Sequence, residues 1–230
     1  MPNIYCLQNN LIEEVLIREK VITSKDKIIK NKEKLTIRNI INVNPKYIFF
    51  PHWSYLVPKE IFNKYNCIAF HASPLPYGRG GSPIQNMIKR GFKKTKVCAF
   101  KINSTIDGGP IYCQSDLSLI GNGEQIYQRL YKSISRMTKK IISMDIIPQN
   151  QKKIGIKKFK RLNYKNNEVP KNKNLKEIYD HIRMTDALDY PRAYVNYGNL
   201  NISFKKPILK KNIISANVKI TLKNDKNKKS

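Results

Sequence analysis

Short apolar runs alternate with amphipathic stretches through the first half of the chain. The runs are rich in β-forming residues and predict buried strands, whereas the stretches between them repeat their apolar residues with helical spacing. Strands are expected at residues 4–7, 21–23, 46–50 and 67–70, and helices at residues 11–17, 35–43 and 58–65. Apolar strands that alternate with helices are typical of parallel strands covered on both faces.

The second half continues this pattern and then changes its composition. A helix is expected at residues 83–90, strands at 96–102 and 111–114, and a long amphipathic helix at 124–144. Residues 149–174 are polar, basic and without periodicity, and they predict a linker or extended loop. A short helix at 175–184 and an antiparallel meander within 193–220 follow. The sequence thus indicates an α/β layer at residues 1–148, a linker at 149–174 and a small α+β appendage at 175–230.

Lysine dominates the charge of the chain. There are 44 Lys and Arg residues against 16 Asp and Glu residues, which gives a formal net charge of +28 at pH 7. Clustered cations are the electrostatic signature of nucleic-acid binding. Most of these cations are lysines scattered among many Asn and Ile residues, which indicates a genome-wide compositional bias. We therefore expect no nucleic-acid partner.

Three kinds of sequence signal are missing, and each missing signal excludes a class of protein. No apolar run approaches the ~20 residues that cross a bilayer, so no membrane span is expected. The N-terminus has no basic region followed by an apolar one, so secretion is not signalled. The four cysteines form no Cys-x-x-Cys pair and the three histidines lack ligand spacing, so we expect reduced thiols in the cytoplasm and no metal site.

Two histidines and one aspartate are candidates for catalysis. His71 follows the strand predicted at residues 67–70, and ligands of open α/β sheets bind at the carboxyl ends of strands. His52 follows residues 46–50 in the same way, so position alone does not choose between them. Asp107 lies in a glycine-rich turn that a ligand can approach closely, although aspartate is also common in ordinary turns. The chain carries no Gly-x-Gly-x-x-Gly, Walker or Gly-x-Ser-x-Gly motif.

Two segments carry a specific combination of residues. In Phe70–Asn86 the histidine is followed by Leu-Pro, Arg-Gly and Pro, and Ile106–Ile111 contains an Asp-x-Gly-Pro turn. This combination resembles the family of formyltransferases that use 10-formyltetrahydrofolate. The resemblance implies an α/β fold with a Rossmann-like catalytic domain and a mostly parallel sheet. It also implies an N-formyltransferase whose co-substrate is 10-formyltetrahydrofolate.

Other residues are similar to the nucleotide-sugar branch of that family, and in particular to the formyltransferase of pseudaminic-acid biosynthesis. They are Phe49–Ser54, Ile182–Ala187 and Tyr190-Pro191. This similarity implies transfer of formyl to the 4-amino group of a UDP-linked dideoxy amino sugar that feeds a surface glycan. The implied partner is a nucleotide-linked amino sugar.

The family's mechanism implies roles for individual residues. An amine attacks the formyl carbon through a tetrahedral oxyanion, so the enzyme must take a proton from nitrogen and stabilise charge on oxygen. By resemblance His71 is the base and oxyanion partner, and Asp107 orients it. The family also uses an asparagine two residues before this histidine. Ala69 occupies that position here, and Asn86 is the candidate that would supply the missing support.

Two further groups of residues are expected to bind the reactants. The folate site is predicted at Trp53, Ser54, Tyr55, Asp107 and Gly108, and the substrate loop at Pro76, Tyr77, Gly78, Arg79 and Gly80. Arg79 could contact an anionic ligand or brace the loop through carbonyl groups. Arg183 and Asp186 lie three apart on a predicted helix, and a surface ion pair is expected there.

Two other functions stay open. An enzyme acting on methionyl-tRNA would keep the chemistry and use the basic charge, but the roughly 80 residues after Pro148 are too few for the full C-terminal barrel of that class. A non-catalytic folate- or nucleotide-binding relative would explain Ala69 and the short opening βα unit. A homodimer is compatible with each of these functions.

Overall fold

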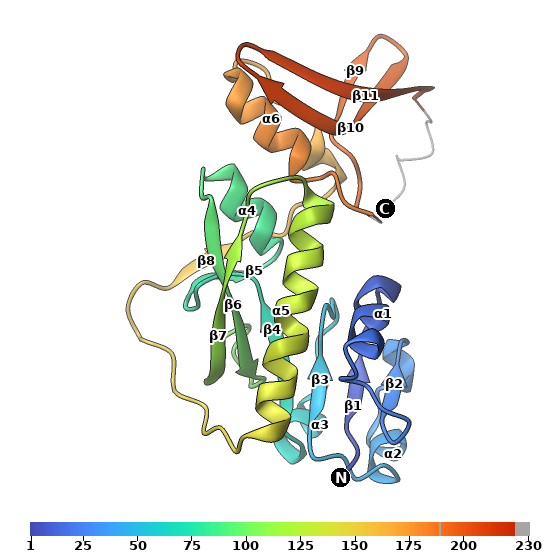
Figure 1. Ribbon diagram of the computed structural model, residues 1–230, viewed down its shortest axis with the longest axis vertical. Coiled ribbons are helices and arrows are strands. Elements are labelled where there is room, and N and C mark those ends of the chain that lie inside the picture. Colours follow the sequence, from blue (N-terminus) through green and yellow to red (C-terminus); the bar gives the residue numbers. More distant parts are fainter. Residues whose placement is uncertain (189, 224–230) are drawn as a thin grey trace.

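A six-stranded sheet forms the centre of the larger part of the molecule (Figure 1). The computed structural model describes residues 1–188 and 190–223. In spatial order the strands are β2 (Lys27–Ile29), β1 (Ile4–Cys6), β3 (Ile48–Phe50), β4 (Cys67–His71), β6 (Lys94–Lys101) and β7 (Ile111–Ser118). The first four are parallel, whereas β6 and β7 pair antiparallel. The predicted α/β fold with a mostly parallel sheet is confirmed.

Helices cover both faces of this sheet. They are α1 (Asn10–Arg18), α2 (Ile37–Ile41), α3 (Lys59–Lys64), α4 (Pro83–Lys89) and α5 (Gly123–Ser143), with a short 3-10 turn η1 (Lys32–Lys34). Because successive strand residues point to opposite faces, Tyr5 and Phe49 pack with α1 and α5, while Ile4 and Ile48 pack with α2 and α3. Among the described residues, no helix combines the length and apolar composition that a membrane crossing requires.

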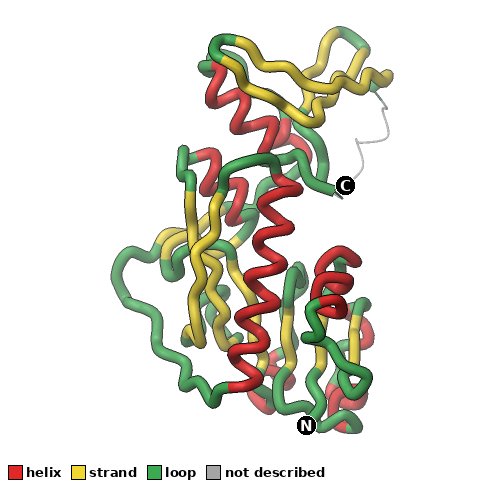
Figure 2. The backbone as a smooth tube through the Cα atoms, in the orientation of Figure 1, coloured by secondary structure: helices red, strands yellow, loops and turns green. Residues whose placement is uncertain are grey.

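The sequence of helix α5 contains both the cap that starts the helix and the apolar pattern that packs it. Asn122 caps it by accepting a hydrogen bond from the Gln125 amide, and the Gln125 side chain bonds back to Asn122. Buried residues then recur along one side, at Ile126, Leu130, Ile134, Met137 and Ile141. Figure 2 shows α5 running along the sheet, and this apolar stripe packs it there. The helix predicted at residues 124–144 is confirmed.

The strand predicted at residues 21–23 is wrong, because the chain turns there. Thr23 donates to Asp26 Oδ2 through both its amide and its hydroxyl, and the Asp26 amide donates back to the Thr23 carbonyl. Val21 is buried, yet its amide closes the end of α1 on the Leu16 carbonyl instead of joining a ladder. The second strand is β2, in the lysine-rich run that follows this turn.

The linker predicted at residues 149–174 contains a packed strand. β8 (Lys157–Phe159) pairs in parallel with β5 (Tyr77–Gly80), and Phe159 is 4% exposed in the core. A short 3-10 turn, η2 (Tyr164–Asn167), follows. One buried aromatic residue in a basic run leaves no periodic pattern, which is why the sequence did not reveal this strand.

The C-terminal part is a helix packed on a small antiparallel sheet. It consists of α6 (Leu175–Arg183), β9 (Tyr194–Tyr197), β10 (Leu200–Lys210) and β11 (Ile213–Leu222), in the spatial order β11-β10-β9 for the strands. The predicted helix and meander are confirmed for the described residues. Figure 1 places this part beyond the end at which α5 begins.

A buried ionic joint ties α6 to the start of α5. Asp186 pairs with Arg192 at 2.6 Å and accepts hydrogen bonds from Asn122 Nδ2 and the Lys206 amide. Arg183 pairs instead with Asp180, at 2.6 Å, and donates to two carbonyls just before α5. The expected surface pair of Arg183 with Asp186 is therefore wrong, because both side chains are buried and have other partners.

Candidate active site

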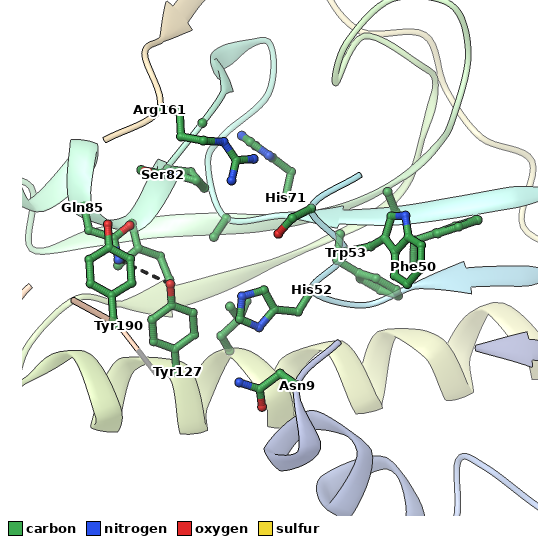
Figure 3. Close-up of a pocket in the computed structure, with 18 of the residues that line it drawn as sticks. Asn9, Phe50, His52, Trp53, His71, Ser82, Gln85, Tyr127, Arg161 and Tyr190 are labelled. Carbon is green, nitrogen blue, oxygen red and sulfur yellow. Dashed lines mark hydrogen bonds between the residues drawn. The ribbon is translucent and has the colours of Figure 1, made fainter. Parts of the chain in front are cut away.

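A cavity of about 670 Å³ opens where β3 and β4 end. Figure 3 shows Trp53 and Phe50 at one end of it and Tyr127 and Tyr190 at the other. His71 lies between these ends. The cavity reaches both faces of the sheet, because it is lined by residues from the α2–α3 side and by residues of α5. Two reactants can therefore approach the end of β4 from different sides.

His71 is buried, 7% exposed, and both of its ring nitrogens face oxygen acceptors. Nε2 lies 2.7 Å from the Gly78 carbonyl, and Nδ1 lies 3.5 Å from Asp107 Oδ2. Because a carbonyl only accepts hydrogen bonds, Nε2 carries the proton that it donates to Gly78, and Nδ1 is left as the nitrogen that can take up a proton and pass it toward the Asp107 carboxylate. The structure thus brings His71 and Asp107 together on the cavity wall, in a geometry that can hold a mobile proton.

The turn that carries Asp107 is fixed by hydrogen bonds from two other segments. Asp107 Oδ2 accepts the Gly80 amide at 2.7 Å. Gln151 donates through Nε2 to the carbonyls of Asp107 and Gly109, each at 2.8 Å. Nothing in the sequence pointed to Gln151, because it lies far along the chain in the predicted linker.

Four of the five residues predicted to bind folate lie on the cavity wall. Trp53, Ser54, Tyr55 and Asp107 line the cavity, whereas Gly108 does not. The rings of Trp53 and Tyr55 meet edge to face, with centroids 5.5 Å apart, and Tyr55 is 43% exposed. An aromatic wall with one exposed edge offers a flat surface for a planar heterocycle.

Of the predicted substrate loop, only Gly80 lines the cavity. Pro76, Tyr77, Gly78 and Arg79 lie behind it. Gly78 acts through its carbonyl, which accepts hydrogen bonds from both His71 and Ser73. Arg79 donates to Gln151 Oε1 at 2.6 and 3.1 Å, so it braces the loop, one of the two roles that the sequence left open.

Asn86 does not fit the role expected of it. Its amide nitrogen donates to the carbonyls of Gly81, Ser82 and Lys160, and its side chain is absent from the cavity wall. It holds segments together and has no donor left for an oxyanion. Ala69, in contrast, lines the cavity on the same side of β4 as His71, because the two residues are two apart along a strand.

The opposite half of the cavity contains residues that the motif did not reveal. His52 stacks on Tyr127 with centroids 5.6 Å apart, and its Nδ1 lies 2.8 Å from the Tyr131 hydroxyl. Burial lowers the pKa of His52 and raises the pKa of Tyr127, so both are neutral near pH 7. Leu130 and Ile134 of α5 add apolar surface. His52 was a candidate because it follows a predicted strand, whereas only the helical period of α5 pointed to Tyr127, Leu130 and Ile134, and that period is also typical of plain core.

Two histidines whose pKa is lowered by burial should make the free energy of unfolding depend on pH. Burial lowers the pKa of His52 and of His181 below the unfolded value of about 6.5. Below that value the unfolded chain binds protons that the folded chain resists, so the free energy of unfolding should fall as the pH drops through about 6.5. Urea unfolding at pH 7.5 and pH 5.5 measures this, and His181→Gln should show a smaller drop. Equal or higher stability of the unmodified chain at pH 5.5 would contradict it.

Comparisons with known proteins fit this geometry. A family model described as formyl transferase matches residues 8–146, and one described as the C-terminal domain of methionyl-tRNA formyltransferase matches residues 164–221. The solved methionyl-tRNA formyltransferase from Clostridium thermocellum is 38% identical with a TM-score of 0.92, covering 97% of this chain and all of that one. A curated methionyl-tRNA formyltransferase from Sulfurihydrogenibium sp. is 25% identical over 222 residues, which are 92% of this chain and 68% of that protein.

These findings correct two expectations. The nucleotide-sugar acceptor is wrong: the formyltransferase PseJ from Anoxybacillus kamchatkensis is 18% identical, with a TM-score of 0.54 and 69% of this chain covered. The exclusion of a nucleic-acid partner is also wrong, because the more similar relatives are named for methionyl-tRNA. The motif residues surround the formyl chemistry, which the branches share, and so they do not identify the acceptor. The chain belongs to the formyl transferase family, as a folate-dependent enzyme that takes its formyl group from 10-formyltetrahydrofolate.

Proposed function

We propose that this enzyme transfers the formyl group to the α-amino group of methionyl-tRNA. The observation that carries the proposal is the match to a methionyl-tRNA formyltransferase over the whole length of both chains, at 38% identity. The length that argued against this acceptor is compatible with that solved chain, which is matched over its whole length, although this chain spans 68% of the curated relative from Sulfurihydrogenibium sp.. The match of residues 164–221 to the C-terminal domain of such enzymes supports the same acceptor.

The charge of the segment between the two parts supports a polyanionic substrate. Residues 149–176 contain ten Lys and Arg residues and one acidic residue, Glu168. All ten cations are exposed: Lys152, Lys153, Lys157, Lys158, Lys160, Arg161, Lys165, Lys171, Lys173 and Lys176. Surface cations that contact phosphates release counterions, which strengthens binding to tRNA and makes it depend on salt.

The cavity suits the two reactants at its two ends. When bound, the folate supplies an activated formyl group, and Trp53 and Tyr55 offer an aromatic surface for its ring system. The apolar surface of Leu130 and Ile134 fits a thioether side chain. His71, between the ends, is placed to accept the proton that the amine loses, and Asp107 keeps the ring in position.

Ala69 offers a direct test of how charge on oxygen is stabilised. In related enzymes, by the resemblance, this position carries an asparagine, and an oxyanion donor contributes about 10²–10³ in rate elsewhere. Because Ala69 faces the cavity beside His71, Ala69→Asn should raise kcat about tenfold. Ala69→Val adds similar bulk without a donor and should not raise kcat. Equal kcat values for the two variants would show that position 69 plays no part in oxyanion stabilisation.

The proposed acceptor is tested by steady-state kinetics with 10-formyltetrahydrofolate. Methionyl-tRNA should be formylated, whereas uncharged tRNA, which lacks the amine, should not react. A UDP-linked 4-amino sugar at millimolar concentration serves as the rival acceptor and should show no turnover. Turnover of the sugar together with inert methionyl-tRNA would refute the proposal.

A further inference from the structure

Arg161 places a positive charge on the wall of the cavity. It lines the cavity although it belongs to the predicted linker. Figure 3 shows its side chain reaching into the space that His71 and Ser82 also face. Its guanidinium is close enough to Tyr190 to act electrostatically on that hydroxyl. The side chain therefore lies near both the proposed catalytic histidine and Tyr190 at one end of the cavity.

The backbone on both sides of Arg161 is fastened to the loop after β5. The Gly81 amide donates to the Phe159 carbonyl, and the Lys160 carbonyl accepts a hydrogen bond from Asn86. After Arg161, the Leu162 amide donates to Ser82 Oγ at 3.1 Å. A Cβ added to Gly81 would collide with the backbone of Arg161, so the two segments are in close contact. A residue held this firmly is a fixed part of the cavity wall.

The guanidinium of Arg161 has hydrogen-bond donors that no described residue occupies. Within residues 1–188 and 190–223 it makes no hydrogen bond or ion pair, and the residue is exposed. The other two arginines near the cavity differ in this respect. Arg79 is bound to Gln151, and Arg90 donates to Asn86 and lies 4.4 Å over the Phe159 ring. Arg161 is thus the arginine on the described cavity wall that can take an anion.

The chemistry of the proposed acceptor identifies that anion. In an aminoacyl-tRNA the amino acid is esterified to the ribose of the last nucleotide, and the phosphodiester of that nucleotide is the anion nearest to the reacting amine. Arginine presents a planar fork of donors that matches phosphate oxygens in pairs. Resting on the function proposed above, we propose that Arg161 binds the last internucleotide phosphate of methionyl-tRNA and so positions the amine at His71.

A neutral phosphate analogue tests this contact. Methionyl-tRNA is prepared with either its natural last phosphodiester or a methylphosphonate, which lacks the charge, at that one linkage. The unmodified enzyme should lose about 10- to 100-fold in kcat/KM on the neutral linkage. Arg161→Ala should be slower on natural methionyl-tRNA by a similar factor and should treat the two tRNAs alike. Arg161→Lys should retain part of the discrimination, because it keeps the charge without the fork.

The neighbouring Lys160 provides the matched control. It is exposed just after the same strand but does not line the cavity, so Lys160→Ala should lower kcat/KM on both tRNAs by the same small factor and keep the discrimination of the unmodified enzyme. Equal discrimination by Arg161→Ala and the unmodified enzyme would overturn the inference, as would equal rates of the unmodified enzyme on both tRNAs. If the unmodified enzyme does not formylate natural methionyl-tRNA, the proposed function itself fails, which is a separate result.

Discussion

His71→Ala is expected to lower kcat for formyl transfer by about a thousandfold, since a placed acid–base group contributes about 10²–10⁴. The ring is held by the Gly78 carbonyl and the Asp107 carboxylate, so alanine removes the proton acceptor and leaves water in its place. The aromatic surface of Trp53 and Tyr55, which we propose for the folate, is untouched, and the Kd for the folate should change by less than about threefold. Rapid-quench kinetics and fluorescence titration with the folate measure the two quantities.

Two further variants make that result specific. Asp107→Asn keeps the shape but removes the charge beside His71, and it should also lower kcat strongly. His181→Gln replaces a buried histidine that does not line the cavity, so it should leave kcat at pH 7.5 within about twofold. If the His71→Ala enzyme kept more than a tenth of the original kcat, His71 would not be the catalytic base.

The second large effect is expected in stability. Asp186→Ala should lower the free energy of unfolding by about 3 kcal/mol, because it removes the buried carboxylate from a pair with the partly exposed Arg192 and leaves that charge uncompensated. Asp186 is 6% exposed, and its carboxylate serves Arg192, Asn122 and the Lys206 amide together. Urea unfolding at pH 7.5 measures the change.

An exposed aspartate is the control for this experiment. Asp145 pairs with Lys46 at 3.2 Å, but its side chain is 91% exposed, so Asp145→Ala should leave the urea midpoint unchanged. Similar midpoints for Asp145→Ala and Asp186→Ala would mean that the joint between α5 and α6 adds little to stability.

Local patterns made most of the fold predictable from the sequence. The apolar stripe of α5 is a local signal, and the structure confirms the helix that it predicted. The pairing of β5 with β8 depends on one buried aromatic residue, Phe159, and on a partner strand of the sequence Tyr-Gly-Arg-Gly. Neither carries a period that marks a strand, so this contact between distant segments could not be predicted.

The residues of the candidate site were likewise predictable only where they belong to a local pattern. His71 and Asp107 could be named because they belong to short motifs, and the structure brings them to 3.5 Å from one another. Gln151 and Arg161 could not be named, because they act from a basic segment without a motif and become neighbours of the site only through tertiary contacts. The acceptor was missed for a related reason: the branches of the family share the formyl chemistry, so a motif that belongs to this chemistry does not distinguish their acceptors.

Transfer of a labelled formyl group in a single turnover tests the central claim most directly. Enzyme in excess is mixed with methionyl-tRNA and 10-formyltetrahydrofolate labelled in the formyl carbon, and the tRNA is then deacylated and its amino acid identified. We expect the label in N-formylmethionine with the unmodified enzyme, and at least a hundredfold slower with His71→Ala. Label that stays on the folate, or that appears only as free formate, would contradict the account.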